Sequence, residues 1–127
     1  MIRGAVPVLD VVAFDEALAY FETALSFRLH FLSAEDGYAE FERDGTWLHL
    51  QRVSVQRTKR RSGIFFTVSS LERLYVEFAA NGAFHQSFPR DLGDVTEHGP
   101  LDDDDGNREL LFMDPFGFLH RFRATTD

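Results

Sequence analysis

The sequence predicts an α+β fold made of two consecutive modules, each with the order strand–helix–strand–strand–strand. Three observations lead to this prediction. Two segments space their apolar residues as amphipathic helices do, the segments around them alternate between apolar and polar residues, and the same order occurs twice in 127 residues. Each half is small for an independent domain. We therefore expect a single domain with a module at 1–53, a linker at 54–62 and a second module at 63–127.

The first module is predicted to begin with a strand at 6–12, which is apolar and rich in β-branched residues. A helix follows, because apolar residues from Phe14 to Leu25 recur at the spacing that gives a helix one apolar face. The pair Asp44-Gly45 lies between two alternating runs and is typical of a tight hairpin turn. The three strands that complete the module are predicted at 27–32, 38–42 and 47–51.

The second module repeats this order, with a strand at 64–68 and a helix at 71–79. Ser69 and Glu72 have the spacing of a capping box and predict where the helix begins. A long polar loop is expected at 90–107. The remaining strands are predicted at 83–88, 109–113 and 118–123.

The composition is that of a soluble globular domain, with 44% hydrophobic and 27% charged residues. Thirteen basic against 21 acidic side chains give a formal charge of −8, which repels nucleic acid and anionic membranes and attracts cationic partners. The absence of cysteine excludes disulfides and cysteine-ligated metals. No apolar run reaches the ~18–20 residues that cross a bilayer. We therefore expect a cytoplasmic protein that binds neither nucleic acid nor membrane.

Four stretches of the chain carry a pattern that extends over most of its length. They are 7–11 with the helix that follows, 43–50, 66–68 with the second helix, and 108–122, which contains Asp114-Pro115-Phe116-Gly117. In these stretches the chain resembles the glyoxalase/bleomycin resistance family, or vicinal oxygen chelate superfamily, and most closely its metal-free bleomycin-resistance-like members. Three positions depart from the family pattern. Ala13 stands where Asp is usual, Ser26 where Gly is usual, and Phe116 where Asp or Asn is usual. The resemblance implies a cup-shaped mixed sheet of about eight strands with helices outside, and a homodimer.

The resemblance also allows a test for a metal site. Metalloenzymes of the family take one ligand from the first and one from the last strand of each module, at positions that map to Val6, His49, Gly63 and Arg121. Val6 and Gly63 offer no side-chain donor, and Arg121 is a permanent cation that repels a metal ion. A divalent ion needs three or more N, O or S donors. We therefore predict no metal and no cofactor.

The resemblance places a ligand site on the inner faces of the strands. The candidate ligand-binding residues are Trp47, His49, Gln51, Glu109, Phe112 and Arg121. The first three share one face of a strand because side chains alternate along it. In the strand at 109–113 the sequence leaves two alternatives open. Either Glu109, Leu111 and Met113 face the site, or Leu110 and Phe112 do.

Structural interpretations of the same residues also stay open. Trp47 fits a half-buried sheet residue, His49 a hydrogen-bonded strand histidine, and Arg121 a partner for Glu109 on the neighbouring strand. The exposed form of such an ion pair is worth ~0–1 kcal/mol.

These observations favour a metal-free and non-catalytic protein that sequesters a small cationic aromatic ligand in a cleft at the interface of a homodimer. Stacking and electrostatics supply the affinity, as the resemblance to antibiotic-resistance proteins implies. The alternative is a metal-dependent lyase, isomerase or dioxygenase of the same superfamily. A third interpretation is an accessory or regulatory domain without a small ligand.

Overall fold

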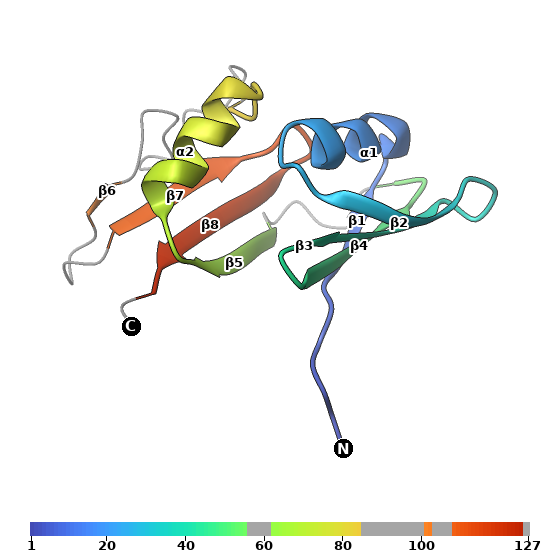
Figure 1. Ribbon diagram of the computed structural model, residues 1–127. Coiled ribbons are helices and arrows are strands. Elements are labelled where there is room, and N and C mark those ends of the chain that lie inside the picture. Colours follow the sequence, from blue (N-terminus) through green and yellow to red (C-terminus); the bar gives the residue numbers. More distant parts are fainter. Residues whose placement is uncertain (56–61, 85–100, 103–107, 126–127) are drawn as a thin grey trace. The chain divides into compact units, whose positions relative to one another are not determined.

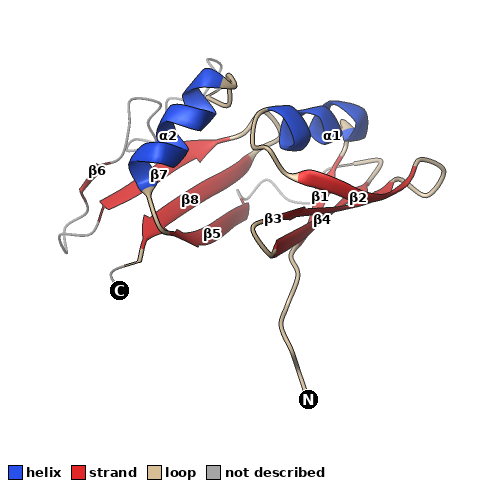
Figure 2. Cartoon of the chain, in the orientation of Figure 1, coloured by secondary structure: helices blue, strands red, loops and turns tan. Residues whose placement is uncertain are grey.

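The computed structural model describes residues 1–55, 62–84, 101–102 and 108–125, and the chain divides into two compact units, Met1–Lys59 and Arg60–Asp127. The boundary falls in the segment that the sequence assigns to the linker. The predicted α+β class is confirmed, and each unit has a helix and a four-stranded mixed sheet of its own (Figures 1 and 2). No helix of the described ranges has the length and apolar character needed to cross a membrane.

The first unit contains one helix and four strands. They are β1 (Val8–Val11), α1 (Phe14–Thr23), β2 (Arg28–Ser33), β3 (Tyr38–Arg43) and β4 (Thr46–Arg52). The strand order is β1-β4-β3-β2, with β1 parallel to β4 and the other pairs antiparallel. Asp44 and Gly45 have φ angles of 52° and 80°, the left-handed values that a type I′ hairpin turn requires between β3 and β4.

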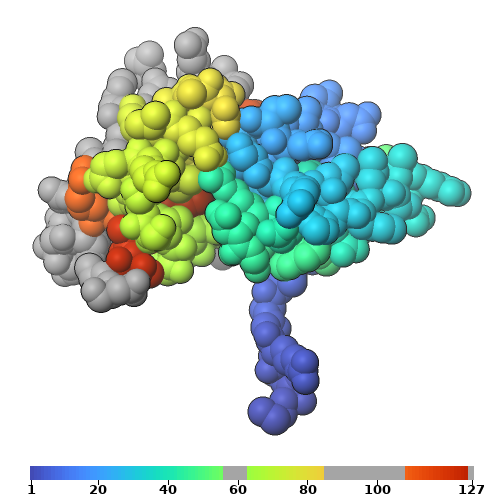
Figure 3. Space-filling model, viewed as in Figure 1, coloured from blue at the N-terminus to red at the C-terminus, as the bar shows by residue number. Residues whose placement is uncertain are grey.

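Helix α1 lies along one face of this sheet and closes the core of the first unit (Figure 1). Phe21 is fully buried and its ring centroid lies 6.1 Å from that of Phe41 in β3. Leu48 and Leu50 of β4 are also fully buried, as the alternation in the sequence predicts. Strand β1 is shorter than predicted, and residues 1–7 are exposed and extend away from the unit (Figure 3).

Ser26 has a φ angle of 57°, a left-handed value that is unfavourable for a residue with a Cβ atom. It occupies the tight connection between α1 and β2. Substitution Ser26→Gly removes the steric cost, which is ~1–2 kcal/mol for a left-handed residue, and the gain is offset in part by the greater freedom of glycine in the unfolded chain. We expect a net stabilisation of about 0.5–1 kcal/mol, measured by urea unfolding. Ser26→Ala keeps the Cβ atom and serves as the control, without a stabilising effect.

The second unit repeats the arrangement of the first. Its elements are β5 (Ser62–Val68), α2 (Leu71–Ala80), β6 (Leu101–Asp102), β7 (Arg108–Met113) and β8 (Phe118–Ala124). The strand order is β5-β8-β7-β6, with β5 parallel to β8 and the other pairs antiparallel. The core is aromatic: Phe78 of α2 makes edge-on ring contacts with Phe112 of β7 and Phe122 of β8.

Three predicted details of the second unit need correction or completion. The residue that caps α2 is Ser70 and not Ser69, since the Ser70 hydroxyl accepts a hydrogen bond of 3.3 Å from the Arg73 amide. Glu72 forms an ion pair with Arg108 instead of completing a capping box.

Strand β6 lies within the predicted loop 90–107 because it pairs with β7. Residues 83–84 are not in a strand, and the rest of the strand predicted at 83–88 lies outside the described residues.

Candidate functional site

The surface of the first sheet opposite α1 carries three of the predicted ligand-binding residues. Trp47, His49 and Gln51 point to this side of β4, whereas the intervening Leu48 and Leu50 point into the core. We call this surface the open face of the first sheet. Its other members on β1 and β3 are Val8, Asp10, Tyr38, Glu40 and Glu42.

His49 is held between two side chains of the neighbouring strand β3. Its Nδ1 atom lies 2.6 Å from the phenol oxygen of Tyr38, and its Nε2 atom lies 3.6 Å from a carboxylate oxygen of Glu40. Glu40 is directly opposite His49 in the antiparallel register, and Tyr38 is its diagonal neighbour. His49 is therefore hydrogen-bonded within the sheet, and the sequence did not identify its partners.

Trp47 lies against a second histidine on the same sheet. The ring centroids of Trp47 and His30 are 4.6 Å apart, and 37% of Trp47 remains exposed. His30 stands at a bulge of β2, where the register with β3 shifts between Leu29 and Phe31. The bulge is the local feature that alternation in the sequence does not reveal.

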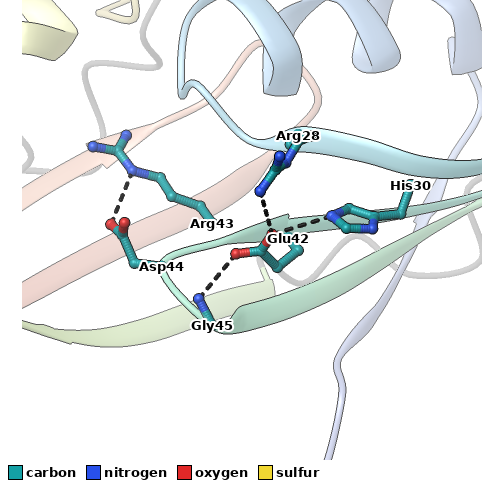
Figure 4. Close-up of polar contacts among 6 residues, drawn as sticks. All are labelled: Arg28, His30, Glu42, Arg43, Asp44 and Gly45. Carbon is teal, nitrogen blue, oxygen red and sulfur yellow. Dashed lines mark hydrogen bonds and ion pairs between the residues drawn. The ribbon is translucent and has the colours of Figure 1, made fainter.

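Glu42 connects His30 to the hairpin turn (Figure 4). Its carboxylate accepts a hydrogen bond of 2.9 Å from the Gly45 amide, lies 3.1 Å from His30 Nε2, and pairs with Arg28 at 3.5 Å. The backbone hydrogen bond from Gly45, followed by the bond to His30, holds the pKa of Glu42 below its usual 4.5. Glu42 is therefore a carboxylate at neutral pH.

The open face of the first sheet carries more negative than positive charge within the described strands. Asp10, Glu40 and Glu42 supply three carboxylates, and Arg28 stands beside Glu42 as the balancing cation. An exposed tryptophan beside such carboxylates attracts flat and cationic molecules through both its ring face and the local field.

The second sheet shows which residues of β7 share a face, a question that the sequence leaves open. Glu109 pairs in register with Arg123, and Leu111 with Arg121, so these side chains lie on the side of the sheet opposite α2. Phe112 points the other way, into the core beneath α2, and is fully buried. Phe112 therefore does not share a face with Glu109 and Arg121, and we correct its assignment from ligand contact to core residue.

Glu109 joins the two arginines of β8. Arg121 donates two hydrogen bonds of 3.0 Å to its carboxylate, and Arg123 donates two more, of 2.9 and 2.5 Å. Both guanidinium groups also lie over the ring of Phe65 at 5.4 Å. Arg123 and Phe65 are members of this cluster that sequence reasoning missed, because the register that aligns them is not visible in one strand alone.

Burial alone would raise the pKa of Glu109, but the hydrogen bonds and charges of Arg121 and Arg123 outweigh it and bring the pKa below 4.5. A carboxyl with a lowered folded-state pKa stabilises the fold above its unfolded pKa, and this contribution disappears as the pH falls through the folded value. We expect wild-type stability to drop more steeply than that of Glu109→Gln between about pH 5 and pH 3. Urea midpoints across this range measure the difference. If stability fell equally steeply with pH in both proteins, the lowered pKa of Glu109 would be contradicted. Glu42 does not affect this comparison, because it contributes equally to both proteins.

The residues at the positions implied for a metal do not fit a metal ion. His49 is the one residue of the four with a suitable donor, and the guanidinium of Arg121 is paired with Glu109. No group of three or more His, Asp or Glu side chains is placed to hold an ion in the part of the chain that the structure describes. The described residues therefore do not supply the three or more donors that a divalent ion needs.

Solved structures of similar fold include bleomycin-binding and bleomycin resistance proteins. A bleomycin-binding protein in complex with bleomycin has a TM-score of 0.78 and 20% identity, covering 98% of this chain and 100% of that chain. The bleomycin resistance determinant of transposon Tn5 also has a TM-score of 0.78 and 20% identity, covering 99% and 100%. The bleomycin-binding protein of Streptomyces verticillus, in complex with copper(II)-bleomycin, has a TM-score of 0.73 and 24% identity, covering 99% and 98%.

No protein-family model matches the sequence, and no characterised protein matches it by sequence. The likeness to solved structures extends over nearly the whole chain and identifies an α+β fold of paired βαβββ modules. This is the glyoxalase/bleomycin resistance fold, as the sequence pattern predicts. A fold of this kind does not by itself decide what is bound or whether a reaction follows.

Proposed function

We propose that this protein sequesters a small cationic aromatic molecule, without a metal and without catalysis, as a cytoplasmic homodimer whose cleft holds the ligand. The observation that carries the proposal is the open face of the first sheet, where the exposed Trp47 lies opposite Glu42, and Glu40 and Asp10 add carboxylates further along the same face. The ring supplies stacking and cation–π attraction, and the carboxylates supply the field. The bleomycin-binding proteins of similar fold support the same class of function.

The second sheet contributes polar groups of another kind. Glu109, Arg121 and Arg123 form a fixed set of charges beside the exposed ring of Phe65. Since two arginines surround one carboxylate, we infer that this cluster can offer hydrogen-bond donors to polar groups of a ligand bound on the second sheet.

The alternative is a metal-dependent lyase, isomerase or dioxygenase. It requires a set of ligands that the described residues do not supply. Elemental analysis of protein purified without chelator separates the two functions. Near-stoichiometric Zn, Ni, Mn or Fe would support the enzyme and overturn the metal-free proposal.

Trp47→Ala is the direct test of the binding proposal. A cation–π contact is worth ~0.5–2 kcal/mol, so we expect the affinity for a cationic aromatic probe to fall by about 2- to 30-fold. Bleomycin and ethidium are suitable probes, with a neutral aromatic of similar size for comparison, and isothermal titration gives the affinity. Trp47 is the single tryptophan of the chain, so quenching of its fluorescence reports binding to the wild type independently.

Val76→Ala provides a matched control, because Val76 is an exposed residue of α2 and lies outside the open face of the first sheet and outside the cluster of Glu109, Arg121 and Arg123. It should leave the affinity unchanged. Failure of every cationic aromatic probe to bind the wild type, or equal binding of the neutral comparator, would refute the proposed ligand class.

A further inference from the structure

Tyr38, His49 and Glu40 form a line of three titratable side chains on the open face of the first sheet. The phenol oxygen of Tyr38 is 2.6 Å from His49 Nδ1, and the two rings meet edge to face with centroids 5.3 Å apart. Glu40 lies beyond the imidazole, 3.6 Å from Nε2. Each of the three is partly exposed, so small molecules in solution have access to the line.

His49 can carry its proton on either ring nitrogen. With the proton on Nε2, the N–H faces the Glu40 carboxylate and Nδ1 accepts a hydrogen bond from the Tyr38 hydroxyl. The distance to Glu40 is longer than a hydrogen bond, and Glu40 therefore acts on the imidazole through its charge. If the phenol proton moves to Nδ1, the imidazolium that forms is stabilised by this carboxylate.

We propose that Tyr38 is a nucleophilic phenol, activated by His49 as general base, that reacts covalently with small acyl or sulfonyl electrophiles. In the sulfonyl case the phenol oxygen attacks sulfur, the new S–O bond forms, and the S–F bond of a sulfonyl fluoride breaks. Fluoride leaves, and the phenol proton passes to His49 Nδ1 and from there to water. The three side chains have the geometry expected of an activated nucleophile, with the base in hydrogen-bond contact with the phenol and a carboxylate beside the base.

Benzenesulfonyl fluoride is the probe, and peptide mass spectrometry measures the labelling rate at each of the three tyrosines, Tyr20, Tyr38 and Tyr75. All three are partly exposed, so access alone favours none of them. A positioned general base contributes about 100-fold or more, and we expect Tyr38 to be labelled at least about tenfold faster than the other two. Labelling in concentrated urea should abolish this preference, because unfolding separates Tyr38 from His49.

His49→Gln distinguishes activation from simple hydrogen bonding. The glutamine amide oxygen can accept the bond from Tyr38 but cannot take its proton, so we expect the Tyr38 rate to fall to that of the other tyrosines. Circular dichroism verifies that the variant is folded. Equal labelling of the three tyrosines in the wild type, modification at His49 instead, or an unchanged Tyr38 rate in the variant would each overturn the proposal.

Glu40 is a positioning residue in this proposal. Glu40→Gln should slow labelling of Tyr38 by about threefold, and Glu40→Asp should restore part of the rate because it restores the charge. Glu22→Gln, which removes an exposed carboxylate from α1, is the matched control and should have no effect. The labelling test does not depend on the proposed ligand: loss of probe binding by Trp47→Ala and loss of labelling by His49→Gln are separate outcomes.

Discussion

Replacing Asp114 with alanine is expected to lower the free energy of unfolding by about 3–5 kcal/mol, a large share of the ~5–15 kcal/mol that folded domains have. Asp114 lies at the turn between β7 and β8, and neither its side chain nor that of His120 is exposed. One carboxylate oxygen is 2.7 Å from His120 Nε2, and the other accepts hydrogen bonds from the Phe116 and Phe118 amides at 2.8 and 3.0 Å. Alanine removes all three interactions and leaves buried polar groups without this acceptor.

Urea unfolding followed by circular dichroism measures the effect. Asp114→Asn keeps one acceptor oxygen for the turn amides, so we expect an intermediate loss of about 1–3 kcal/mol. Asp36→Ala removes an exposed turn aspartate that bonds to Ser33 and should cost under about 1 kcal/mol. A loss for Asp114→Ala no larger than that of Asp36→Ala would show that the buried pair does not secure the turn.

The fold could be predicted because its determinants are local. The hairpin between β3 and β4 follows from Asp44-Gly45, and the helices follow from the spacing of residues such as Phe14 and Phe21, whatever the rest of the chain does. Strand β6 was not predicted because it is two residues long and is defined by its pairing with β7. Such pairing depends on a partner that is distant in sequence.

The candidate site was harder to predict, for a related reason. Alternation correctly placed Trp47, His49 and Gln51 on one face, since they belong to a single strand. It could not show that Tyr38 reaches His49, because this contact depends on the antiparallel register between β3 and β4. No sequence pattern distinguishes His120 from an ordinary strand histidine, because its burial depends on packing between β8 and β7.

Phe112→Ala is the second substitution with a large expected effect, a loss of about 3–5 kcal/mol. The Phe112 ring is fully buried and is surrounded by other rings. Its ring contacts, with centroid separations from 5.1 to 5.9 Å, are with Phe78, Phe84, His120 and Phe122. Removing the side chain forfeits the burial of the ring and leaves a cavity that rigid aromatic neighbours fill poorly.

The neighbouring residue, Leu111, provides the control for which face of β7 packs against α2. Leu111 points to the opposite face of β7 and is partly exposed, so Leu111→Ala should cost only about 1 kcal/mol. Phe112→Leu retains most of the apolar volume and should lose less than Phe112→Ala. Both measurements are made by urea unfolding. If Leu111→Ala proved the more costly of the two alanine substitutions, β7 would have the other face towards α2, and Phe112 would return to the ligand-binding set in place of Glu109.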